Sequence, residues 1–117
     1  MTNTKMVKKY KKVILDYCKT HSGTSFAELT RAFAAAGLEY EGDKSIGYPG
    51  CRNVIIWCNW TEDAITALHE LSDEVILEPC PPVVYFLDGM MPDLPLTSHP
   101  QSYKKPHWVP YWLQMRH

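Results

Sequence analysis

Five prolines punctuate the last 28 residues of this 117-residue chain and constrain its fold more than any other feature. They stand at Pro92, Pro95, Pro100, Pro106 and Pro110. Because proline lacks a backbone N–H and fixes φ near about −65°, this spacing excludes a long helix or a long central strand. We therefore expect a domain formed by residues 1–89, with residues 90–117 as an extended, proline- and aromatic-rich tail that packs across it.

Three segments before this tail have the spacing of helices. Apolar residues recur at helical intervals over residues 6–18, with lysines on the other faces. Ser25 and Glu28 have the spacing of a capping box, which predicts the start of a second helix. A third helix is expected over residues 61–72, with Thr61 as its N-cap.

The remaining segments predict strands and turns. Residues 53–58 are β-branched and aromatic, which is typical of a buried strand. Residues 38–50 are rich in glycine and lack periodicity, so they predict a loop or a mobile arm. Two further β-rich runs, residues 75–78 and 83–87, flank a Pro-Cys-Pro-Pro sequence, which predicts a β-hairpin with a rigid tip.

These elements predict an α+β domain with three helices and a small antiparallel sheet. Their order resembles the winged-helix class, a helix-turn-helix variant in which a β-hairpin follows the recognition helix. The resemblance covers residues 5–89, although the strand at 53–58 lies between the second and third helices rather than between the first and second. It implies that residues 61–72 would be the helix that reads a DNA groove. The expected core comprises Tyr10, Ile14, Tyr17, Leu29, Phe33, Ile55, Trp57, Ile65, Leu68, Ile76, Val84 and Phe86.

The charge distribution argues against that mode of DNA binding. The formal net charge is −1, but both ends of the chain are basic and the middle is acidic, with no Lys or Arg between Arg52 and Lys104. An acidic helix repels phosphates, on whose neutralisation nucleic-acid affinity depends. We therefore expect a non-catalytic interaction module, an accessory or regulatory subunit that docks on a partner protein, for example in a nucleic-acid-handling assembly. The expected docking residues are Glu62, Asp63, Glu70, Pro81, Pro82, Trp108 and Trp112.

Direct DNA or RNA binding is the alternative. Lysines of the first helix and of the tail would hold phosphates, and two tail tryptophans would stack on bases. The residues concerned are Lys5, Lys8, Lys9, Lys12, Lys104, Lys105, Trp108 and Trp112. The interpretation without a binding role is that the lysines form a solvated helix face and that both tryptophans are buried against the domain.

The pattern for metal or thiol chemistry is weak. Cys18 and His21 have half-site spacing for zinc, but the gap between Cys51 and Cys58 exceeds the usual two to four residues. No cysteine has a histidine at a spacing that suggests a nucleophile and its base. We expect reduced thiols, no metal, no cofactor and no enzymatic activity. The sequence contains no apolar run of the length of a membrane span and predicts a cytoplasmic protein.

Overall fold

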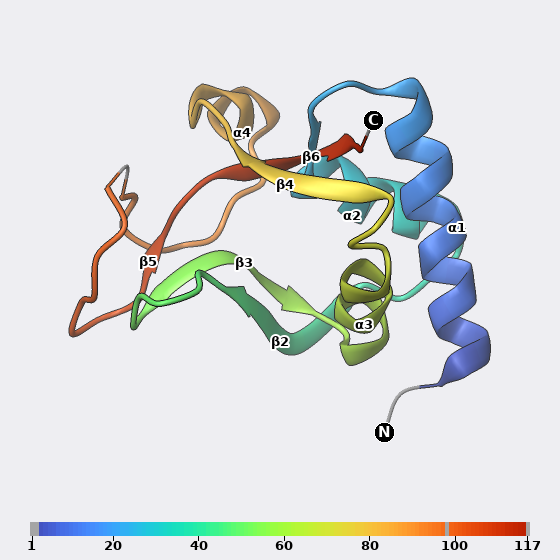
Figure 1. The fold of residues 1–117 in the computed structure, drawn as a ribbon, viewed down its shortest axis with the longest axis horizontal. Helices are drawn as coiled ribbons and strands as arrows, with labels where there is room; N and C mark the ends of the chain where they lie inside the picture. Colours follow the sequence, from blue (N-terminus) through green and yellow to red (C-terminus); the bar gives the residue numbers. More distant parts are fainter. Residues whose placement is uncertain (1–2, 98, 117) are drawn as a thin grey trace.

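Ten helices and strands follow one another along residues 3–97 and 99–116, the residues that this computed structural model describes (Figure 1). In chain order they are α1 (Thr4–Thr20), β1 (Thr24–Ser25), α2 (Phe26–Ala35), β2 (Glu41–Gly47), β3 (Val54–Trp60), α3 (Glu62–Glu70), β4 (Val75–Pro79), α4 (Val83–Asp88), β5 (His107–Trp108) and β6 (Tyr111–Met115). The α+β class is confirmed, but the described residues form four helices rather than three. The strands form two sheets, in the orders β1-β6-β4 and β2-β3-β5.

The three expected helices are α1, α2 and α3, and local caps explain where each begins. The Asn3 side chain accepts hydrogen bonds from backbone N–H groups in the first turn of α1. Ser25 and Glu28 form the expected capping box, with N–H to oxygen distances of 3.1 and 2.7 Å. Thr61 caps α3 through the N–H of Ala64. These caps need only a few consecutive residues, so the sequence alone predicts them.

The expected loop at residues 38–50 is wrong, because most of this segment is the strand β2, which pairs antiparallel with β3. The pairing is bulged, since both Glu41 and Lys44 lie opposite Trp60. Gly42 makes the close approach possible. A Cβ at this position would lie 2.5 Å from the carbonyl oxygen of Trp60, too close for any side chain.

A substitution at Gly42 tests this contact. We expect Gly42→Ala to lower the free energy of unfolding by about 1–3 kcal/mol, because the added methyl group must push the backbones of β2 and β3 apart. Gly47→Ala is the matched control in the same strand, since a Cβ there meets nothing within 4 Å. Urea denaturation of both variants checks the prediction, and equal stabilities would contradict it.

The expected hairpin is also wrong, because its second arm is the helix α4. Pro82 has φ −62°, which suits the start of a helix, and its carbonyl accepts the N–H groups of Tyr85 and Phe86. Gly89 ends the helix at φ 87°, a left-handed conformation that glycine adopts readily. Helical geometry turns Tyr85 inward and leaves Phe86, an expected core residue, 51% exposed.

Residues 107–115 are part of the sheets rather than a surface tail. The strand β6 is the centre of its sheet and pairs antiparallel with both β1 and β4. The strand β5 pairs parallel with β3. Pro110 lies between β5 and β6, outside both strands, so the prolines interrupt the segment without excluding it from the sheets. Because β4 pairs with β6 instead of forming a hairpin after α3, the winged-helix arrangement is not confirmed.

The core is a continuous line of aromatic rings. Consecutive rings in this line have centroids 5.1 to 5.6 Å apart. In spatial order the members are Tyr10, Phe33, Trp60, Phe26, Trp57, Tyr85 and Trp108. Offset and edge-on ring pairs of this kind stabilise a core beyond the area that they bury. The line runs from α1 through α2, β3 and α4 to β5, so it packs three helices against the β2-β3-β5 sheet.

Of the other expected core residues, most are buried or packed against the core. Those that are buried are Ile14, Leu29, Ile65 and Leu68. Those that are partly buried are Tyr17, Ile55, Ile76 and Val84. Phe86 is therefore the clear exception, and its exposure leads to the first candidate site.

Candidate functional site

The helix α4 presents an apolar face to solvent. Val83 is 50% exposed, Phe86 51% and Leu87 84%. Positions three and four apart lie on one side of a helix, so these three side chains form one surface, here called the α4 face. A contiguous apolar surface on a small domain often marks a site of contact with another molecule.

Buried contacts hold α4 in this orientation. The Tyr85 hydroxyl donates to the carbonyl of Tyr111 at 2.5 Å and accepts the N–H of Phe26 at 3.1 Å. Burial raises the pKa of Tyr85, so the hydroxyl stays protonated and its O–H remains available to donate to the Tyr111 carbonyl. At the other end of α4, Asp88 accepts a hydrogen bond from Arg31 of α2 at 2.6 Å. The apolar face is thus fixed on a rigid body.

The surroundings of α4 in the sequence are acidic. Residues 75–93 contain Glu78, Asp88 and Asp93 and no Lys or Arg. Arg31 is the cation that α2 brings to this region, and it already pairs with Asp88. The Pro81 and Pro82 residues expected at a hairpin tip lead directly into α4, with Pro81 exposed and Pro82 partly buried.

The acids expected to dock from α3 lie beside α1. Asp63 accepts the backbone N–H of Asn3 at 2.9 Å, and Glu70 pairs with Lys11 at 3.2 Å. Glu62 is exposed and also has an interaction within the protein. The structure therefore uses acids of α3 to hold α1, which the sequence order did not reveal.

The two tail tryptophans do not stand free. Trp108 is 1% exposed and packs edge-on against Tyr85. The ring of Trp112 is partly buried and covers Gly23, where a Cβ would lie 3.0 Å from it. Burial of Trp108 removes it from both the expected docking surface and the expected base-stacking surface. The positions of both rings are consistent with a packing role, which is the interpretation without a binding function.

The expected phosphate-binding lysines belong to two separate surfaces. Lys5, Lys8, Lys9 and Lys12 are exposed on α1, where Lys12 pairs with Asp16 at 2.9 Å. Lys104 and Lys105 are also exposed. They lie in the loop before β5, at the opposite end of the molecule from α1 (Figure 1). The structure does not bring the two groups together.

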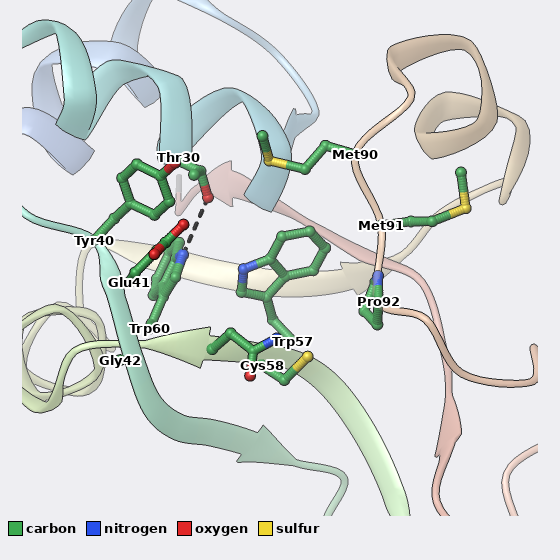
Figure 2. A pocket seen from close by; sticks show the side chains of 11 residues that line it. Thr30, Tyr40, Glu41, Gly42, Trp57, Cys58, Trp60, Met90, Met91 and Pro92 are labelled. Carbon is green, nitrogen blue, oxygen red and sulfur yellow. Dashed lines mark hydrogen bonds between the residues drawn. The ribbon is translucent and has the colours of Figure 1, made fainter.

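A second candidate site is a pocket between β3, the start of β2 and the segment after α4 (Figure 2). Its volume is about 420 Å³. Trp57 and Trp60 both reach it although they stand three apart on β3, because Asn59 has φ 65° and interrupts the alternation of the strand. Met90 and Met91 close the other side. A further cavity of about 430 Å³ lies between α3, β2 and β4.

Three of the four cysteines, Cys18, Cys58 and Cys80, are shielded rather than activated. Burial raises the pKa of Cys80 to about 11 and also raises the pKa of Cys18 and Cys58. A raised pKa keeps a thiol protonated near neutral pH and slows its reactions. Within the described ranges 3–97 and 99–116, His, Cys, Asp and Glu side chains do not gather in threes at a site that suits a metal ion.

The α4 face was missed because β-branched residues pointed to a strand. A signal was present in the sequence, since Pro81-Pro82 precedes and Gly89 follows the segment, as at the start and end of a helix.

The described helices include none that is long and apolar enough to cross a membrane. No protein-family model, curated protein or solved structure matches this chain.

Proposed function

We propose that this protein is a non-catalytic interaction module that docks on a partner protein through the α4 face. The exposure of Val83, Phe86 and Leu87 on one side of a rigidly held helix carries the proposal. Exposed apolar side chains at this spacing are the anchors by which a helix binds in a groove of another protein. Protein anchors of this kind need a fixed scaffold, which the Tyr85 and Asp88 contacts supply.

The chemistry around α4 favours a particular kind of partner. The α4 face is bordered in sequence by Glu78 and Asp93, and residues 75–93 carry no cation. Complementary charges at the rim of an interface favour encounter and fix orientation. The partner we propose presents an apolar groove bordered by Lys or Arg residues.

Variants of α4 test this function. The tagged protein is used to capture its partner from the native host, and the dissociation constant of the purified pair is then measured by calorimetry. We expect Leu87→Asp to weaken binding about 30-fold or more, because a carboxylate replaces a central apolar anchor. Phe86→Asp should act in the same way, and the affinity of the wild type should fall with added salt.

Leu96→Asp is the matched control, because Leu96 is 41% exposed and lies outside α4. It should bind the partner as the wild type does. Equal affinities for all three variants would overturn the proposal. A dimer of this chain that Leu87→Asp dissociates would show that a second copy covers α4 instead. Micromolar binding of oligonucleotides that Lys8→Glu and Lys9→Glu abolish, without a protein partner, would favour the nucleic-acid alternative.

A further inference from the structure

The indole N–H of Trp57 forms no hydrogen bond within the described part of the chain. The residue as a whole is 5% exposed, but its ring nitrogen, unlike those of Trp108 and Trp112, is not sealed from solvent. The neighbouring Trp60 differs, since its N–H donates to the Thr30 hydroxyl at 3.1 Å. Figure 2 shows the ring nitrogen of Trp57 facing the pocket between Trp60 and Met90. An indole N–H that opens on a pocket can donate to an acceptor of a bound molecule, so the Trp57 N–H is available to a ligand there.

Two other indoles serve as a comparison. The ring nitrogens of Trp108 and Trp112 are buried and also have no partner within residues 3–97 and 99–116. Neither residue lines the pocket of Trp57 or the cavity beside α3. Trp57 is thus the tryptophan whose unpaired N–H coincides with a space that a ligand can enter.

The walls of the pocket favour a flat apolar compound. Its lining includes the rings of Tyr40, Trp57 and Trp60 and the thioether of Met90, whereas the Met91 side chain points away from the pocket (Figure 2). Rings stack on flat ligands, and thioether sulfur packs well against aromatic edges. A volume of about 420 Å³ falls within the range of small-molecule sites, which are mostly apolar with a few polar groups.

The charge at the pocket restricts the ligand further. Glu41 lines the pocket, its residue is exposed, and no cationic side chain lines the pocket with it. A carboxylate at the wall of a pocket repels an anionic ligand and attracts a donor or a cation. A ligand that suits this pocket is therefore neutral or cationic at the end that lies near Glu41.

We propose that this pocket binds a flat aromatic compound of one or two rings, neutral or cationic, whose hydrogen-bond acceptor takes the N–H of Trp57. The proposal does not rest on the docking function of α4. It assigns Trp57 as the residue that recognises the acceptor and Trp60 as a wall, because the N–H of Trp60 is already used by Thr30.

Quinoline and naphthalene are suitable probes, because they share a shape and differ by one acceptor nitrogen. The ¹⁵N-labelled protein is titrated with each, and the indole N–H signals of the four tryptophans are followed by NMR. We expect quinoline to move the Trp57 signal downfield, with smaller changes at Trp108 and Trp112. A static Trp57 signal at millimolar quinoline, or equal movement of all four signals, would overturn the proposal.

A variant isolates the hydrogen bond from the stacking. In Trp57→Phe the affinity for quinoline relative to naphthalene should fall about fivefold to tenfold, the effect of one neutral hydrogen bond. Trp112→Phe, which removes an unpaired indole outside the pocket, should leave this ratio unchanged. An unchanged ratio in Trp57→Phe would overturn the assignment, and if this variant does not fold, the wild-type signals decide.

A third experiment tests whether the pocket prefers ligands without a negative charge. Quinoline-4-carboxylate should bind the wild type at least about tenfold more weakly than quinoline, and Glu41→Gln should restore most of this loss. Equal binding of the two probes by the wild type would overturn the part of the proposal that concerns charge.

Discussion

Trp108→Ala is expected to lower the free energy of unfolding by about 3–5 kcal/mol, close to the whole stability of many small domains. The ring is 1% exposed, ends the aromatic line at Tyr85, and belongs to the strand that pairs with β3. Its removal leaves a cavity beside Tyr85, between β5 and α4. Chemical denaturation followed by far-UV circular dichroism measures the loss.

Lys105→Ala is the matched control, because this side chain is exposed and lies three positions before Trp108. It should change the stability by less than about 0.5 kcal/mol. A surface tail predicts the opposite pattern, in which Trp108→Ala leaves the stability intact and affects binding alone. A midpoint of unfolding that Trp108→Ala leaves unchanged would therefore contradict the position of this ring in the core.

Tyr85→Phe is expected to cost about 2–4 kcal/mol of unfolding free energy, although it removes one oxygen atom. That oxygen joins the N–H of Phe26 to the carbonyl of Tyr111, and the ring is fully buried. Without the hydroxyl, two backbone groups in the core lose a partner, and each unsatisfied group carries its own desolvation penalty. Urea denaturation compares the variant with the wild type.

The same exchange at another tyrosine provides the control. Within the described residues the Tyr40 hydroxyl has no hydrogen-bond partner, so Tyr40→Phe should leave the stability within about 0.5 kcal/mol of the wild type. Similar losses for the two variants would show that the Tyr85 hydroxyl does not hold α2, α4 and β6 together. A loss confined to Tyr85→Phe would also explain why α4 keeps its orientation.

The parts of the fold that the sequence predicts are those that depend on neighbours in the chain. The capping box of Ser25 and Glu28 requires four consecutive residues, and the helix α2 begins there. The strand β3 follows from its own β-branched and aromatic residues. The strand β2 does not, because its pairing depends on the approach of Gly42 to Trp60, which lies far along the chain.

The helix α4 shows how tertiary contacts override local preference. Residues 83–87 are β-branched and aromatic, which favours a strand in isolation. As a helix, the segment places Tyr85 between Phe26 and Tyr111 and exposes Leu87. The α4 face was therefore out of reach of a periodicity argument that began from a strand.

The pocket was equally hidden from the sequence. Its walls come from β2, β3 and the segment after α4, and they meet only in the folded chain. The left-handed conformation of Asn59 places Trp57 and Trp60 on one side of their strand, which simple alternation excludes. Trp57 appeared in the sequence as a core residue, and it is one, with its N–H as the exception.

The central position of β6 in its sheet affects how the chain folds during and after its synthesis. Thr24 pairs with Leu113, so this sheet is complete only when β1 and β6, which lie far apart in the described sequence, have met. Contacts between such distant positions slow folding, because a long loop must close before any pairing rewards it. During synthesis β1 and β4 emerge without the strand that joins them, and their edges stay open until residue 115 has been made. The open edge of β4 can pair with another chain in the interval between the synthesis of residue 79 and that of residue 115.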